Sequence, residues 1–365
     1  MLFYMNSNHS FQKIIEEIAS PDRLMVAIIA VLMAGVVGII TGPLASNANP
    51  YFWALFDRIM GNTARKAYIK EKSLSALIFR GTFFTIAFVL LATVFGAVLY
   101  MLKRAMPMGG FTEPFLLSLL CTSGAVIVSV YRLYLALNRD QASKDDRRGS
   151  FAPVAVTAKV DLNSVDEFGS ARMGAGLIPV LFDRGMVTPI FWYLIGGLPL
   201  AFLVTGILTA KWALAKNGFA KGYAVFAGSL EIILGFIPRV ISSFLLILSA
   251  VLTPHAGITR SISSLFAFKE QAPALEGGLP LTITAYALNA SLGGAVQDVD
   301  GSALPQKFVG PAGATAKVDA AILKQACYLG GMAHLLFLAL LLGLLMLMTA
   351  TAPASVPMVV PPIGG

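Results

Sequence analysis

The sequence predicts an all-α integral membrane protein with about six transmembrane helices and long cytoplasmic loops that carry short helices. Of the 365 residues, 57% are hydrophobic and only 13% are charged, and the mean hydropathy is +0.77. Soluble domains usually carry about 25% charged residues. Several apolar runs also reach the ~20 residues that a helix needs to cross a bilayer. Together these observations favour a membrane-embedded bundle.

Hydropathy divides the chain into a simple series. Six segments follow one another: an amphipathic N-terminal segment (1–23), spans one to three (24–140), a polar loop (141–186), spans four and five (187–252), a Gly-rich loop (253–327), and the last span with an uncharged tail (328–365). The N-terminal segment is amphipathic because its apolar residues recur at helical spacing.

Basic residues fall mainly in the loops after spans one, three and five. The positive-inside rule therefore predicts that these loops are cytoplasmic and that both termini lie outside, in the cytoplasmic (inner) membrane of a bacterium. On this prediction the short turn between spans four and five, with Lys211, Lys216 and Lys221, lies on the outer side.

Two ionisable residues, Glu231 and Arg239, lie inside the fifth span. Each costs roughly 3 kcal/mol at membrane depth unless it is paired or faces water. They are eight residues apart, so an unbroken helix places them on roughly the same face. Gly235 and Pro238 predict a kink between them. One interpretation is a buried pair that satisfies itself, and the other is a polar pocket at a broken helix.

Charged pairs outside this span also leave alternatives open. Asp183 and Arg184, just before span four, are either an interfacial ion pair or part of a site. Asp298 and Asp300 flank Val299 in the Gly-rich loop. Two such carboxylates can hold Mg²⁺ beside a phosphate, or they can form an acidic turn.

Other kinds of chemistry have little support in the sequence. The three histidines and two cysteines share no metal-ligand spacing, and the cysteines lie in or beside apolar segments. The net charge of +8 lacks the aromatic interleaving of a nucleic-acid surface. We therefore expect no nucleic-acid partner and no His/Cys metal centre.

Several short blocks occur in a familiar order. They are Asn49-Pro50, then RGTFF, GMVTPIFWYLIGGLP from Gly185, Lys216-Asn217, Leu230-Glu231, Phe236-Ile237-Pro238, and a C-terminal block with Gly278-Leu279-Pro280, Leu292-Gly293-Gly294, Gly301 and Gly310. Over roughly residues 40–325 the chain resembles the CobD/CbiB family. These proteins are membrane adenosylcobinamide-phosphate synthases of cobalamin biosynthesis.

The resemblance implies an amide-forming ligase that joins an aminopropanol phosphate-type amine to adenosylcobyric acid, with ATP and Mg²⁺. The implied partners are the corrinoid substrate, the phosphorylated amino alcohol, the lipid bilayer and other proteins of cobalamin synthesis. The implied site comprises Glu231, Arg239 and Asp183 for catalysis, Asn49, Lys216, Asn217, Gly293, Gly294 and Gly301 for substrate binding, and Asp298 and Asp300 for the metal.

The chain departs from the family pattern at polar positions, which makes it a divergent member. Asn49 replaces a His, and Ile207, Ala210, Ile232 and Gly235 stand where the family has polar residues. Asp183 and Arg239 each lie one place early.

A second resemblance is to AmpE-type membrane proteins, which share the F-W-x-x-x-G-G pattern found at 191–197. The alternative function is therefore a non-catalytic membrane protein of the same fold that has lost the site and acts in signalling or assembly.

Overall fold

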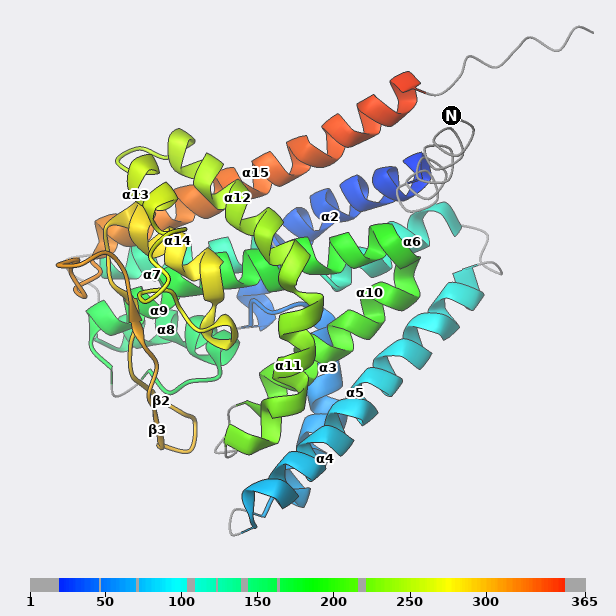
Figure 1. Ribbon diagram of the computed structural model, residues 1–365, viewed down its shortest axis with the longest axis horizontal. Coiled ribbons are helices and arrows are strands. Elements are labelled where there is room, and N and C mark those ends of the chain that lie inside the picture. The colour runs from blue at the N-terminus through cyan, green and yellow to red at the C-terminus, as the bar shows by residue number, and fades with distance from the viewer. Residues whose placement is uncertain are drawn as a thin grey trace, which may run out of the picture.

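A computed structural model describes residues 20–45, 47–69, 72–103, 109–122, 124–138, 144–162, 165–215 and 221–351. In these ranges the chain is almost entirely helical, with two small antiparallel ribbons (Figure 1). The fold agrees with the predicted all-α membrane class.

Four helical segments of the described chain are long and apolar enough to cross a membrane. They are α2 (Pro21–Ala45), α5 (Leu74–Lys103), the continuous run of α9 (Glu167–Phe182), η2 (Asp183–Val187) and α10 (Thr188–Leu214), and α15 (Ala320–Thr351). Two bent pairs raise the number to six if each is one span. These are α6 (Gly109–Leu119) with α7 (Gly124–Leu137), bent by 41°, and α11 (Val225–Leu234) with α12 (Phe236–Leu252), bent by 64°.

Short elements fill the connections. They are α3 (Tyr51–Phe56), the π-helix η1 (Asp57–Gly61), α4 (Asn62–Ala67), α8 (Lys144–Ala158), η3 (Lys221–Ala224), α13 (Ile258–Ser263), η4 (Ala274–Glu276), α14 (Gly278–Leu288), β1 (Leu292–Gly293), β2 (Val296–Gln297), β3 (Ala303–Leu304) and β4 (Phe308–Val309). Strand β1 pairs with β4, and β2 pairs with β3, both antiparallel.

The segment expected as a polar loop, 141–186, contains α8, α9 and most of η2. Helix α9 begins after Asp166, whose Oδ1 accepts a hydrogen bond from the Gly169 amide at 2.7 Å. Such an N-cap satisfies one of the amides that a helix start leaves free. The apolar run of the fourth span therefore begins well before residue 187.

The run from α9 to α10 reverses direction within α10. Gly196 and Gly197 depart from helical geometry, and Gly197 has φ 67° and ψ −163°. The freed carbonyls of Leu194 and Ile195 accept hydrogen bonds from Arg23 Nη1 at 3.0 and 2.9 Å. The turn is thus tied to the start of α2.

After this turn α10 returns antiparallel to α5. Gly96, late in α5, faces Phe202, whereas Gly206 faces Phe88 farther back along α5. The close approach continues past α10, because a Cβ on Gly81 would lie 1.9 Å from the Tyr223 carbonyl oxygen. The second half of α10 therefore runs back along α5, which is its main neighbour.

This arrangement corrects the predicted position of the turn after α10. Lys211 Nζ donates to the Leu275 carbonyl at 2.8 Å, and Gly222 packs against Leu74 at the start of α5. The α10 end therefore lies at the same end of the bundle as the first and third long loops. The sequence predicted opposite sides because it treated 187–214 and 223–252 each as one full crossing, whereas α10 turns back at Gly196–Gly197 and α11–α12 is bent by 64°.

The bent pair α11–α12 begins and ends near this same end. It starts beside α5 at η3, and just beyond α12 the Gly257 amide bonds the Ala287 carbonyl. The final helix also starts here, since Gly174 of α9 faces Leu323 of α15. Helices α2 and α15 then run side by side, with their outer ends together (Figure 1).

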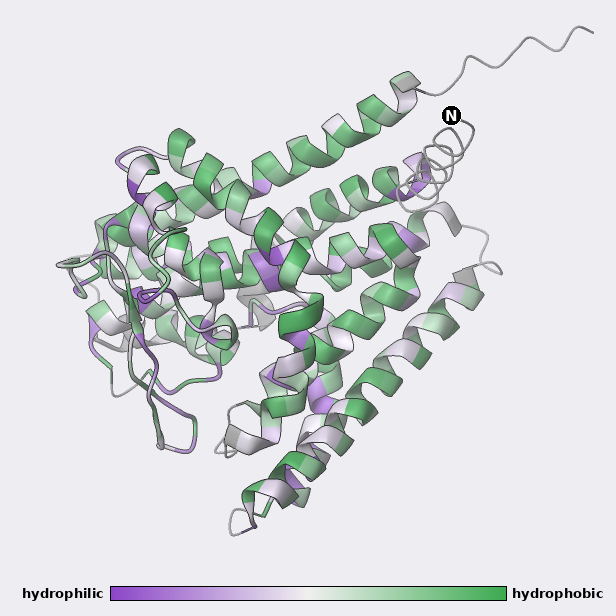
Figure 2. Cartoon of the chain, in the orientation of Figure 1, coloured by the Kyte–Doolittle hydropathy of each residue, from purple (hydrophilic) through white to green (hydrophobic). Residues whose placement is uncertain are grey.

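Buried side chains pack into a large apolar core shared by α2, α5, α10, α12 and α15. A second cluster joins α7, α8, α9, α14 and the start of α15. Figure 2 shows mainly apolar helices, with polar colour concentrated in the loops and near the middle of the bundle. That central polarity belongs to the site described next.

Candidate functional site

Five charged side chains meet where η2 touches the bent pair α11–α12. Glu231 Oε1 lies 2.5 Å from Arg184 Nε and 3.8 Å from Arg239 Nη2, and its Oε2 lies 3.7 Å from Lys211 Nζ. Asp183 Oδ2 lies 3.5 Å from Arg239 Nε. We call Asp183, Arg184, Lys211, Glu231 and Arg239 the charge cluster.

Irregular helix geometry brings the charge cluster together. Asp183 and Arg184 lie on a π-helix, which widens the turn and is common at functional sites. The 64° bend at Gly235 confirms the kink predicted between Glu231 and Arg239. Both side chains reach η2. A Cβ on Gly235 would lie 2.6 Å from the Glu231 carbonyl oxygen, so the bend requires glycine.

Two ion pairs of the charge cluster join η2 to the bent pair α11–α12. Asp183 and Arg184 are neighbours in sequence, yet Asp183 pairs with Arg239 and Arg184 pairs with Glu231. Asp183 and Arg239 are also the two residues that each lie one place early against the family pattern.

The charge cluster is buried but incompletely satisfied. Glu231 is 2% exposed; its Oε1 is held in the close ion pair with Arg184 at 2.5 Å, whereas its Oε2 lies 3.7 Å from Lys211 and accepts no hydrogen bond from the described residues. Asp183 is better satisfied, because Ser242 Oγ donates to its Oδ1 at 2.8 Å. A buried acceptor without a hydrogen bond is costly, so Glu231 is the group best placed to receive a donor from a ligand.

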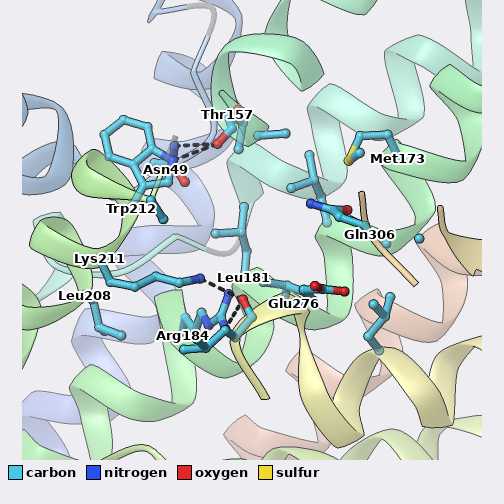
Figure 3. A pocket seen from close by; sticks show the side chains of 18 of the residues that line it. Asn49, Thr157, Met173, Leu181, Arg184, Leu208, Lys211, Trp212, Glu276 and Gln306 are labelled. Atoms are coloured by element: carbon cyan, nitrogen blue, oxygen red, sulfur yellow. Dashed lines mark hydrogen bonds between the residues drawn. The ribbon is translucent and has the colours of Figure 1, made fainter. Parts of the chain in front are cut away.

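A cavity of about 130 Å³ opens beside the charge cluster. Arg184, Lys211, Glu231 and Asn49 line it (Figure 3). Asn49 Nδ2 donates to the Thr157 carbonyl at 3.0 Å, while its Oδ1 is buried and accepts no hydrogen bond. We call this the first cavity; it combines cations, the carboxylates of Glu231 and Glu276, and the amide oxygen of Asn49.

A larger cavity of about 720 Å³ lies on the other side of Trp212, which lines both. Its cations are Arg58, Arg65 and Lys159, and its carboxylates are Asp57 and Asp161. We call this the second cavity. The lining therefore carries a net positive charge.

Lys159 is the buried cation of the second cavity. Its Nζ lies 3.0 Å from Asp57 Oδ2 and 3.8 Å from the centre of the Trp212 ring. Burial lowers the pKa of Lys159, and the charge of Asp57 opposes that shift. Its φ of 50° is left-handed, which is uncommon for a residue with a side chain. The protein therefore holds this amine in a constrained position.

The predicted site residues divide into three groups. Glu231, Arg239 and Asp183 come together in the charge cluster. Asn49 and Gly293 line the first cavity, and the Gly293 carbonyl accepts from Arg172 Nε at 2.8 Å. The third group lies elsewhere or outside the described residues.

Asp298 and Asp300 lie in the turn between β2 and β3, together with Gly301. Asp298 is buried, and its Oδ1 accepts from the Val299 amide at 2.7 Å. Asp300 accepts from the amide and hydroxyl of Ser302. This geometry fits the acidic-turn interpretation. Within the described residues no group of three His, Cys, Asp or Glu side chains could hold a metal ion.

Of the remaining predicted binding residues, Gly294 and Gly301 do not line the first cavity. Gly294 has φ 88° and packs beside Phe308, and Gly301 has φ 80° with open space where a Cβ would lie. Lys216 and Asn217 lie outside the described residues. Positive φ was expected at the Gly-Gly pair, and both of its glycines have it.

Sequence reasoning missed the second cavity and the role of Lys211. One signal was available, because both π-helices begin with an Asp-Arg dipeptide, Asp57-Arg58 and Asp183-Arg184. In each case the aspartate pairs with a distant cation. The spacing to Lys159 or Trp212 carries no comparable signal.

Comparison with known proteins finds one distant relative. A stretch of 187 residues, 50% of this chain, is 28% identical to "Cobalamin biosynthesis protein CobD" of Brucella anthropi. The likeness is to a CobD protein. It covers 56% of that relative, so the chain spans about half the length of the curated relative it matches. No family model and no solved structure matches. The relationship is therefore CobD-like and distant, and with the apolar helices it indicates a bacterial membrane protein.

Proposed function

We propose that this protein acts in cobalamin biosynthesis as a membrane enzyme that forms an amide between adenosylcobyric acid and an aminopropanol phosphate-type amine. Support comes from the CobD relative and from the family blocks in the sequence. The observation that carries the proposal is Glu231, a buried carboxylate held by cations at the wall of the first cavity.

The chemistry requires three things of the protein. An amine must be held and lose a proton, negative charge on the reacting oxygen must be stabilised, and a phosphate group must be bound. Glu231 and the Asn49 amide oxygen are acceptors for the amine in the first cavity. Arg184 and Lys211 supply positive charge beside them. Asp183 and Arg239 position this pair from the adjoining helices.

The size of the first cavity supports a small occupant in this proposal. About 130 Å³ suits a small amine, whereas a corrin ring is far larger. In this proposal the ring stays outside and only one of its side-chain carboxylates reaches the amine. The second cavity, across Trp212, offers Arg58, Arg65 and Lys159 to a phosphate group.

ATP would activate the corrinoid carboxylate in this reaction, with Mg²⁺ as its counter-ion. The basic lining of the second cavity suits the phosphates of ATP. The carboxylates of Asp298 and Asp300 are engaged by their own turn, so they do not form a ready-made Mg²⁺ site. We assign no step of the reaction to the metal.

Complementation tests the proposal. The gene should restore growth on cobyric acid to a bacterium that lacks its own adenosylcobinamide-phosphate synthase. Glu231→Gln should abolish the rescue, while Glu167→Gln, an exposed carboxylate at the start of α9, should keep it. Immunoblots of the membrane fraction control for protein level. A well-expressed wild-type protein that gives neither rescue nor amide product in isolated membranes would rule out the activity.

A second candidate is the non-catalytic membrane protein with a signalling or assembly role. One observation favours it: Ile207 and Ala210, where the family has an Asn and an Asp, are 3% and 0% exposed in apolar packing. Helix α10 therefore offers no polar group at these positions. Failure of the wild-type gene to complement, with correct membrane insertion, would favour this candidate.

A further inference from the structure

An apolar groove runs along the outside of the bundle, away from both cavities. It has a volume of about 620 Å³ and lies between α2, α7 and α15. Its lining includes Leu32 and Val36 of α2, and Leu335 and Leu338 of α15. Leu32, Val36 and Leu335 are 52%, 59% and 60% exposed, so no described part of the chain covers them.

The two ends of the groove differ in chemistry. One end carries Lys324, with Tyr131 and Tyr328 beside it, and the rest is almost wholly apolar. Lys324 Nζ lies 5.9 Å from the rings of both Tyr134 and Tyr328, and no described carboxylate pairs with it. The groove therefore has a cationic, hydroxyl-bearing head and an apolar body.

The head lies at the level where a lipid headgroup would be. Lys324 is one turn inside the start of α15, at the end of the bundle where the long loops gather. From Lys324 to Leu338 the helix rises about 21 Å, at ~1.5 Å per residue. This exceeds the ~15 Å of hydrocarbon in one leaflet, half of a ~30 Å core. An acyl chain entering at the head can therefore follow the groove through the whole depth of its own leaflet, past Gly331, and end near the bilayer midplane before it reaches Leu338.

From this geometry we infer that the groove binds an anionic phospholipid, with its phosphate at Lys324 and one acyl chain along α15. Basic pockets between membrane helices are suited to anionic headgroups, and tyrosine hydroxyls at that depth can donate to the phosphate. The inference does not rest on the proposed enzyme activity, because the groove shares no lining residue with either cavity.

Native mass spectrometry of the purified full chain tests this inference. The protein in detergent is given phosphatidylglycerol or phosphatidylcholine with identical acyl chains. We expect retained phosphatidylglycerol adducts in preference to phosphatidylcholine. Lys324→Gln should lower phosphatidylglycerol binding about fivefold, the effect of one basic residue near an anionic headgroup, and should leave phosphatidylcholine binding unchanged.

A matched pair of glycine variants tests the position of the acyl chain. Gly331 lines the groove, Gly343 lies farther along the same helix outside it, and neither has an atom within 4 Å of an added Cβ. Gly331→Leu should fill the groove and abolish binding of both lipids, whereas Gly343→Leu should bind like the wild type.

Three results would overturn the inference. They are equal binding of the two lipids in wild type and Lys324→Gln, unchanged binding in Gly331→Leu, and conversion of a wild-type dimer to a monomer by Gly331→Leu. The last result would assign the groove to a second copy of the chain. If Gly331→Leu does not fold, the exposed Lys324→Gln variant still decides whether the site selects anionic headgroups.

Discussion

Glu231 is the residue on which the central site depends. Three cations approach its two oxygens, and its removal leaves Arg184, Lys211 and Arg239 facing one another with only Asp183 to balance them. Buried ion pairs contribute little net stability when compared with apolar residues, but breaking one is costly because a buried charge is left uncompensated. The residue therefore affects both stability and chemistry.

The first prediction concerns stability at this residue. Glu231→Gln should lower the free energy of unfolding by about 3–5 kcal/mol, and Arg184→Met added to it should recover part of that loss. Thermal unfolding in detergent measures both. Glu276→Gln is the control, since Glu276 lines the same cavity but is only half-buried, and a glutamine can still accept the hydrogen bond from the Lys307 amide; it should change stability by less than ~0.5 kcal/mol. Equal effects of the two Gln variants would contradict the buried network.

The elements show how irregular helix geometry creates the site. Two π-helices and one bent helix pair direct charged side chains inward, where regular helices would direct them toward lipid or core. The Gly196–Gly197 turn matters as much, because it sends α10 back so that Lys211 and Trp212 reach the cavities. Without that turn the two cavities lose a shared wall.

The second prediction concerns this turn. Gly197 has φ 67° and ψ −163°, a region that is open essentially to glycine alone. Gly197→Ala should lower the free energy of unfolding by about 1–3 kcal/mol. The cost is one of backbone conformation, because the added Cβ meets its nearest atom at 3.9 Å. Thermal unfolding in detergent measures it.

Gly343→Ala serves as the control for Gly197→Ala, because Gly343 lies in the regular helix α15 with open space around it. It should leave stability unchanged or raise it by up to ~1 kcal/mol, since Ala is the better helix former. A Gly197→Ala protein as stable as the wild type would show that α10 does not turn there as described.

At the scale of the whole molecule, the end of α10 and the start of η3 lie at the same end of the bundle as the described parts of the long loops. The other end holds the start of α2 and the Gly196–Gly197 turn. The lysines near the α10 end thus join the basic loops instead of opposing them. The difference in basic charge between the two ends is therefore larger than the sequence indicated. By the positive-inside rule, we predict that the loop-rich end is cytoplasmic.

The third prediction tests this arrangement. Single cysteines at Asn217 and Lys269, in a chain with Cys121 and Cys327 replaced by Ala, should show the same reactivity toward a membrane-impermeant maleimide. Both should be protected in intact cells and labelled after lysis. A cysteine at Asp22, at the other end, should be labelled in intact cells. Opposite labelling of positions 217 and 269 would restore the sequence-based topology.

The sequence by itself determined the helical membrane class, the kink between Glu231 and Arg239, and the family likeness. These depend on local composition and spacing, which a chain displays without folding. It could not determine which charges meet. Asp183 pairs with Arg239, and Asp57 pairs with Lys159, although the partners lie far apart in sequence. The reversal at Gly196–Gly197 then decides which end of α10 lies beside these pairs. Only tertiary packing decides such contacts, because the free energy that holds a buried charge depends on neighbours that no local pattern specifies.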